Sequence, residues 1–148
     1  MSADLASRFP EKYRKDFCAR LLIPGGVFQL FARETHPPKV KRFIVIALSA
    51  ADKMAAIIFI NTAPPGSDYL RSFQLALRAN GRPYLDHDSY ADCSRLYERR
   101  LDELENIFVN DTEIYLGALS EEDLKQATGI VRTARTIPLK VKRRYRLV

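Results

Sequence analysis

Four cations at every second position near the end of the sequence could bind a nucleic-acid backbone. The alternation from Pro138 to Val148 predicts an extended strand, one face of which would carry Lys140, Lys142, Arg144 and Arg146. Each contact between a cation and a phosphate adds salt-sensitive affinity, so this face is a candidate RNA contact. Two other interpretations stay open: a charged edge strand that discourages aggregation, and docking to an acidic partner protein.

The two histidines are the side chains best suited to proton transfer near neutral pH. His36 lies in a polar loop six residues before Arg42 and is the candidate general acid or base, with a solvated loop residue as the alternative. His87 stands between Asp86 and Asp88, a setting typical of a surface turn.

No pattern in the sequence predicts a metal or cofactor site. Cys18 and Cys93 are far apart, as are the two histidines, so the paired spacing of metal ligands is missing. The segment Pro24-Gly25-Gly26 lacks both the lysine and the following helix of a phosphate-binding P-loop. We therefore expect neither a metal nor a cofactor.

Composition indicates a folded, single-domain protein of 148 residues, of which 47% are hydrophobic. No apolar run reaches the roughly 18 residues of a membrane span, and the first residues do not resemble a signal peptide. Two cysteines are too few for a disulfide framework and fit a reducing compartment. The expectation is a cytoplasmic protein that does not enter a membrane.

Positive charge is concentrated at the C-terminal end. The net charge is +6, and residues 132–148 hold seven cations and no acid. These are Arg132, Arg135, Lys140, Lys142, Arg143, Arg144 and Arg146. The basic character is therefore local, which indicates a local anionic contact.

The elements that must position these side chains are mainly strands. Aromatic residues at helical spacing predict a helix within residues 1–20. Apolar runs predict a first strand at 27–31 and two strands buried on both faces at 43–48 and 54–60. A five-residue link makes the last two an antiparallel hairpin.

The second half of the sequence mixes short strands with two helices. Alternation predicts strands at 72–78 and 89–96, and a short strand is expected at 112–116. A helix is expected at 101–108. A second helix, with Ser120 as its N-cap, is expected to run to about residue 136. Together these elements predict an α+β, mainly β fold with a small, strongly bent antiparallel sheet or partly open barrel.

This order of elements resembles the C-terminal half of the MazF/PemK (Kid) toxin family. The segment Asp92-Cys93-Ser94-Arg95-Leu96 stands where the family has a D-Q-x-R element, and residues 119–124, LSEEDL, match its "Ls.edl" helix start. The resemblance covers roughly residues 22–137 and implies a small SH3-like barrel with a C-terminal helix. Residues 1–20 would be an added N-terminal helix, and 138–148 a basic C-terminal strand.

The resemblance also implies an activity: metal-independent cleavage of single-stranded RNA by the toxin of a type II toxin–antitoxin system. Arg42 matches the arginine that binds the scissile phosphate, and Asn61 or Thr62 would supply the second phosphate contact, with His36 as acid or base. Lys41 and Arg95 would contact RNA.

The partners implied by the family are RNA, an antitoxin protein and a second copy of the chain in a homodimer. The sequence departs from the family pattern at Gly25-Gly26-Val27, where an acid is missing, and at Asp92–Leu96, where no glutamine stands. Two alternatives therefore remain open. One is a non-catalytic MazF-like module that binds nucleic acid or protein, and the other is an adaptor that uses residues 1–20.

Overall fold

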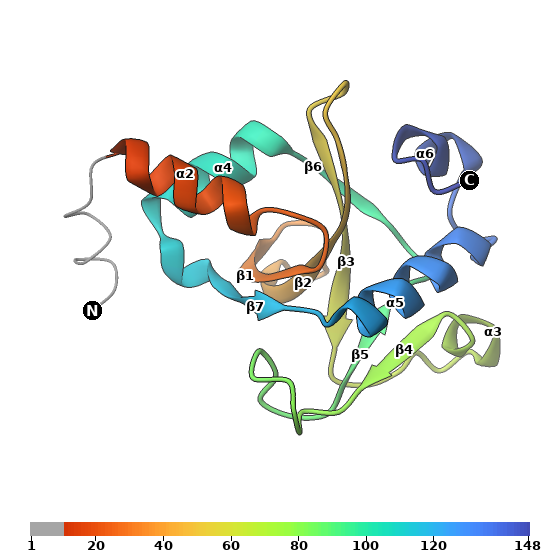
Figure 1. Ribbon diagram of the computed structural model, residues 1–148. Helices are drawn as coiled ribbons and strands as arrows, with labels where there is room; N and C mark the ends of the chain where they lie inside the picture. Colours follow the sequence, from red (N-terminus) through yellow and green to blue (C-terminus); the bar gives the residue numbers. More distant parts are fainter. Residues whose placement is uncertain (1–10) are drawn as a thin grey trace.

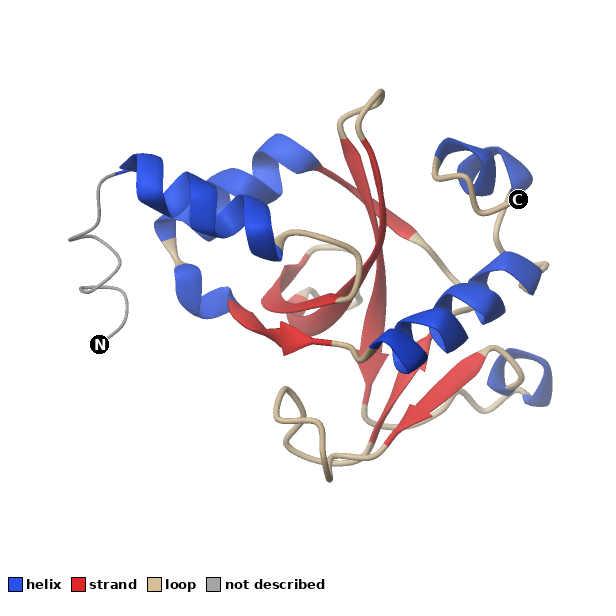
Figure 2. Cartoon of the chain, viewed as in Figure 1, coloured by secondary structure: helices blue, strands red, loops and turns tan. Residues whose placement is uncertain are grey.

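A curled antiparallel sheet forms the centre of the computed structural model, which describes residues 11–148 (Figures 1 and 2). The strands are β1 (Gly26–Ala32), β2 (Lys39–Ser49), β3 (Met54–Asn61), β4 (Gln74–Leu77), β5 (Ser89–Asp92), β6 (Tyr97–Arg100) and β7 (Tyr115–Ala118). Their order is β4-β5-β3-β2-β1-β7, and β6 pairs with β3 beside β5. The fold is α+β, with a half-barrel sheet, as the sequence predicts.

Helices cover both sides of the sheet. They are α2 (Glu11–Leu21), α3 (Asp68–Arg71), α4 (Leu101–Asn110), the 3-10 helix η1 (Thr112–Ile114), α5 (Glu121–Thr133) and α6 (Leu139–Arg144). In Figure 1, α2 and α4 lie on one side of the sheet and α5 and α6 on the other. None of the helices in residues 11–148 has the length and apolar character needed to cross a membrane.

The antiparallel β2–β3 hairpin lies at the centre of the sheet, which confirms the predicted hairpin. Phe43 lies opposite Phe59, and Ile44 opposite Ile58. Because successive strand residues point to opposite faces, Ile44 enters the core under α5 and Phe43 the core under α4. A register shift between Val45 and Ala47 marks an irregularity in the hairpin, of the kind that bends a sheet.

Helix α5 begins where the sequence predicts. Ser120 is the N-cap, and its Oγ accepts a hydrogen bond from the Asp123 backbone N–H at 3.1 Å. Ala127 and Val131 bury the inner face of the helix. The helix ends at Thr133, three residues earlier than expected.

Two predicted strands are only partly correct. The predicted strand 89–96 ends early, at Asp92, because the Asp92 carboxylate accepts hydrogen bonds from the backbone N–H and hydroxyl of Ser94 and closes a turn before β6. The predicted strand 112–116 begins as η1, where the Asp111 carboxylate accepts from the Glu113 N–H at 3.1 Å. The predicted strand 72–78 is confirmed within the narrower bounds of β4.

The predicted C-terminal strand is wrong, because residues 139–144 form helix α6. Lys142 is 6% exposed, and its Nζ donates to the carbonyls of Arg132 at 2.8 Å and Ala134 at 2.7 Å. Tyr145 and Leu147 then enter the core under α5. The basic segment therefore packs on the end of α5. Of the helix predicted within 1–20, α2 covers the last half, and residues 1–10 lie outside the described part.

Candidate functional site

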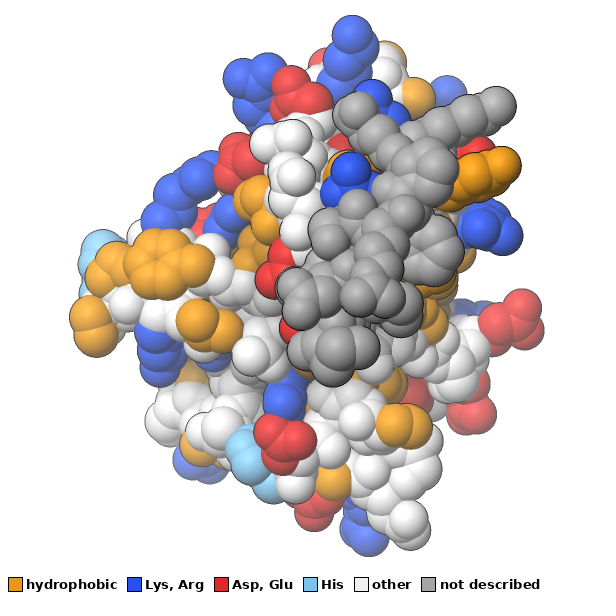
Figure 3. Space-filling view, turned by 90° about the vertical axis from the view of Figure 1, so that its left-hand side faces the viewer, with side chains coloured by type: hydrophobic (Ala, Val, Ile, Leu, Met, Phe, Trp, Pro, Cys, Tyr) orange, Lys and Arg blue, Asp and Glu red, His pale blue; other side chains and the backbone are white. Residues whose placement is uncertain are grey.

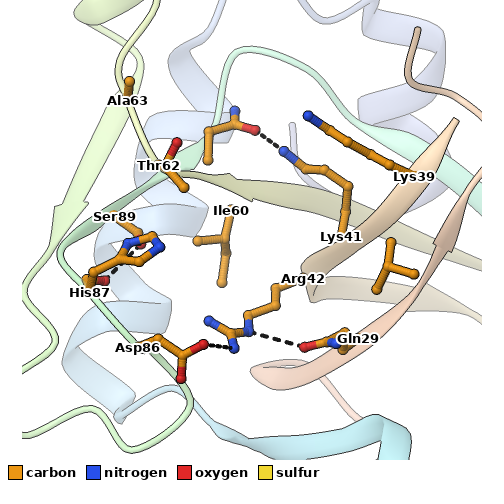
Figure 4. Close-up of a pocket in the computed structure, with 12 residues that line it drawn as sticks. Gln29, Lys39, Lys41, Arg42, Ile60, Thr62, Ala63, Asp86, His87 and Ser89 are labelled. Carbon is orange, nitrogen blue, oxygen red and sulfur yellow. Dashed lines mark hydrogen bonds and ion pairs between the residues drawn. The ribbon is translucent and has the colours of Figure 1, made fainter. Parts of the chain in front are cut away.

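An open groove of about 620 Å³ lies at one end of the sheet (Figure 4). Its walls are the start of β2, the end of β3 with the loop that follows, and the end of the segment between β4 and β5. Three cations line it: Lys39, Lys41 and Arg42. Strand pairing places these segments together, because Arg42 lies opposite Ile60 and Ile60 opposite Ala91.

Arg42 reaches across the groove from β2. Its Nε donates to Gln29 Oε1 at 3.3 Å, and its Nη2 donates to Asp86 Oδ2 at 2.6 Å. The register explains the first bond, since Gln29 and Arg42 are direct partners in β1 and β2. Within residues 11–148 no group bonds to Arg42 Nη1. The N–H groups of this atom are therefore available to an anion.

Asp86 is the acid of the groove. Its side chain is 77% exposed, and the hydrogen bond and charge of Arg42 lower its pKa. The carboxylate is therefore ionised at neutral pH and balances part of the positive charge of the groove.

Lys41 and Asn61 form a second pair, in which Lys41 Nζ donates to Asn61 Oδ1. The ammonium also lies 5.7 Å from the centre of the Phe59 ring. Partial burial, and next the charge of Lys39, lower the pKa of Lys41. Asn61 thus holds a cation at the groove wall.

Thr62 directly follows β3 and is exposed at the groove. Alternation within β3 sets Ile60 on one face and Asn61 on the other, and Figure 4 shows Thr62 near Ile60 and His87. Ile60 is the direct partner of Arg42. Of the two predicted phosphate contacts, Thr62 is therefore the one that shares the face of Arg42.

The histidine at the groove is His87, which the sequence analysis assigned to a surface turn. Its Nδ1 lies 3.2 Å from the Asp88 carbonyl and 3.3 Å from Ser89 Oγ, and the ring stands at the groove beside Thr62 and Ile60 (Figure 4). His36 sits in the loop between β1 and β2 and does not line the groove. The two histidine side chains occupy separate places on the surface (Figure 3).

The remaining predicted RNA contacts lie away from the groove. Arg95 is exposed in the turn between β5 and β6, with its guanidinium 5.0 Å from the centre of the Tyr97 ring. Arg144 pairs with Glu98 at 2.5 Å and with Asp52 at 3.8 Å. Because Lys142 is buried and Arg144 is paired, the four cations of the predicted strip do not share one exposed face, and only Lys140 and Arg146 are exposed.

Metal ligands do not cluster in residues 11–148: no group of three or more His, Cys, Asp or Glu side chains could hold a metal ion. Cys93 is fully buried, which raises the pKa of its thiol to about 12. It is therefore a packing residue and not a nucleophile.

The groove combines what a phosphodiester needs for binding and proton transfer. It has a forked guanidinium, two ammonium groups, the hydroxyls of Thr62 and Ser89, and an imidazole, supplied by three separate segments of the chain. Comparison with known proteins adds no further assignment: no protein-family model matches the chain, and no curated protein matches it.

Proposed function

We propose that this chain is a MazF/PemK-like toxin of a type II toxin–antitoxin system, an endoribonuclease that cleaves single-stranded RNA at the groove without a metal. One observation carries the proposal: Arg42, Thr62 and His87, from β2, the end of β3 and the loop before β5, line one groove together with Lys39 and Lys41. The curled antiparallel sheet supports the SH3-like barrel that the resemblance implies.

The reaction uses the 2′-hydroxyl of the RNA as its nucleophile. His87 accepts the proton of the 2′-hydroxyl, the 2′-oxygen bonds to phosphorus, and the 5′-oxygen of the next nucleotide leaves with a proton from water or from His87. The products are a 2′,3′-cyclic phosphate and a free 5′-hydroxyl. Arg42 and Thr62 donate hydrogen bonds to the phosphate oxygens as negative charge develops on them. His87 thus takes the acid–base role that the sequence suggested for His36.

The same proposal includes a cytoplasmic location, a homodimer and an antitoxin protein as partner. These follow from the family resemblance and from the positive charge of the chain, which suits RNA and an acidic protein segment. No cofactor takes part.

The test is cleavage of a single-stranded RNA oligonucleotide by purified protein in excess EDTA. We expect a 2′,3′-cyclic phosphate product, and no product when the nucleotide 5′ to the cut carries 2′-deoxyribose. His87→Ala should lower the rate about 100-fold or more, whereas the matched variant His36→Ala should cleave like the wild type. Intact RNA with the wild type, or equal effects of the two histidine variants, would refute the proposal.

A non-catalytic RNA-binding module is the second candidate. The ion pair between Arg42 and Asp86 favours it, because the guanidinium already has an anionic partner at 2.6 Å. This candidate predicts salt-dependent binding of the same oligonucleotide without cleavage. The EDTA assay above separates the two, since only the first yields a cyclic phosphate.

A further inference from the structure

An exposed apolar pair lies next to the groove. Phe31 in β1 is 59% exposed and Val40 in β2 is 57% exposed, and the two are direct partners across the strands. Elsewhere these strands bury their apolar residues, as Val27 and Ile44 show at 0%.

The pair continues the row of side chains that holds Arg42. Gln29 and Arg42 are partners in the same two strands, and Phe31 and Val40 lie two residues further along each. Two strand residues span about 7 Å, and their side chains point to the same face. Phe31 therefore stands within about one nucleotide of the guanidinium, and Val40 itself lines the groove.

The strand end that carries Phe31 is anchored. Arg99 Nη2 donates to the Phe31 carbonyl at 3.3 Å, and Arg99 also pairs with Glu34 at 2.8 Å. Thr35 Oγ1 donates to the carbonyl of Ala32 at 3.1 Å and so closes the chain back on itself. An exposed aromatic ring on a fixed backbone loses little freedom when a flat ligand stacks on it.

We propose that Phe31 and Val40 form a subsite for an unpaired RNA base, next to the phosphate held by Arg42. This inference rests on the proposed function and adds to it a binding place for one base. Charge favours this occupant: Arg42 lies on the same face of the strands as the apolar pair, and Lys39 and Lys41 line the same groove from neighbouring positions of β2. A nucleotide unites an anion with a flat apolar ring. A second copy of this chain, with the same cations at this face, would meet like charge.

The sequence allows a direct measurement of stacking, because it contains no tryptophan. In Phe31→Trp the new indole is the only one, and a stacked base should quench its emission. The probe is a 2′-O-methyl RNA oligonucleotide, which cannot react through its 2′-oxygen. We expect saturable quenching by this probe, and none by an abasic oligonucleotide with the same number of phosphates.

Affinity gives the second readout. Phe31→Ala should weaken binding of the base-containing probe about tenfold and leave binding of the abasic probe unchanged. Tyr69→Ala, which removes another aromatic ring that is 55% exposed, is the matched control and should bind like the wild type. Equal binding of the base-containing probe by wild type and Phe31→Ala would overturn the subsite.

The outcomes separate the two proposals. If the wild type binds no oligonucleotide, both fail. If it binds and cleaves RNA but neither quenching nor the Phe31→Ala effect is found, the base subsite alone fails. Sedimentation of the wild type and Phe31→Ala completes the test: a dimer that dissociates in the variant would assign the pair to a subunit contact and overturn the subsite.

Discussion

Arg42 divides its guanidinium between a neutral and a charged partner. Gln29 holds Nε from the neighbouring strand, which fixes the direction of the side chain. Asp86 holds Nη2 from a loop, with a side chain that is 77% exposed. An exposed ion pair is easily exchanged for another. Asp86 is thus the partner that a phosphate would displace, whereas Gln29 would stay in place.

Asp86→Asn should raise the affinity for a 2′-O-methyl RNA oligonucleotide several-fold, because it removes the competing charge at Arg42 and keeps the shape of the side chain. Asp68→Asn removes one acid from an exposed site on α3 and is the control. Fluorescence anisotropy at one fixed salt concentration measures both. If the two variants behave alike, the groove is not where RNA binds.

Arg99 is a buried charged residue that joins β6 to the β1–β2 loop and to α4. It stands in β6 with a side chain 3% exposed, and it bonds to Glu34 in the β1–β2 loop and to Glu103 in α4. Burial tends to raise the pKa of Glu34, but the hydrogen bond and charge of Arg99 outweigh it, so the pKa lies below its ordinary value. Arg99 thus ties the loop before β2, which leads into the groove, to β6 and α4, and the Arg33–Glu103 pair is a second tie to α4.

Arg99→Met should destabilise the protein by about 3 kcal/mol, because it leaves the partly buried Glu34 carboxylate without its partner. Arg33→Met is the control: Arg33 pairs with the same Glu103 but is 62% exposed, and we expect less than about 1 kcal/mol. Urea unfolding at pH 7 measures both values. A similar loss in the two variants would contradict the importance of burial.

The loss of stability caused by Arg99→Met, relative to the wild type, depends on pH. The folded-state pKa of Glu34 is lowered, so its contribution to stability is present above the unfolded value of about 4.5 and is lost as pH falls through the folded value. The gap between Arg99→Met and the wild type should therefore narrow in acid below that pH.

Whether a segment forms a helix or a strand could be predicted where its sequence pattern fits one of the two clearly better. The apolar runs of β2 and β3 are short and bounded by turn residues, which favours strands, and the Ser120 cap favours a helix start. The C-terminal segment suits two, since Ile137, Val141 and Tyr145 are spaced by four, which is compatible with alternation and also with a helical face. The helix is favoured because it brings Lys142 to the carbonyls at the end of α5. No local sequence pattern reveals this contact.

At the scale of the whole molecule, Lys142 connects the two last helices. Its ammonium donates to two carbonyls at the C-terminal end of α5, those of Arg132 and Ala134, of which the second also accepts from the Ile137 backbone N–H at 3.3 Å. A cation is also favoured there by the helix dipole. The position of α6, and of the core residues that follow it, depends on this contact.

Lys142→Met should lower the free energy of unfolding by about 2 kcal/mol, because the aliphatic stem is kept while hydrogen bonds from a charged donor are lost. Lys140→Met, at an exposed position of the same helix, should stay within about 0.5 kcal/mol of the wild type. Thermal or urea unfolding measures the pair. Equal stability of the two variants would show that the buried contact is dispensable.

The candidate site could be predicted from sequence only in part, because one of its residues is brought in by strand pairing between distant parts of the chain. Arg42 and Thr62 lie in or next to a hairpin whose register follows from its turn, so their proximity was foreseeable. His87 joins them through the pairing of Asn61 with Tyr90, two strands far apart in the sequence. Long-range pairing of this kind has no local signal, so His87 resembled an ordinary turn residue.

The shared core of the first strand and the last residues has a consequence for synthesis on the ribosome. Val27 of β1 belongs to the same buried cluster as Tyr145 and Leu147, more than 110 positions later. While the chain is being made, β1 and β2 leave the exit tunnel long before the residues that complete this cluster. The buried cluster that Val27 shares with Tyr145 and Leu147 can therefore be completed only when translation has passed Leu147.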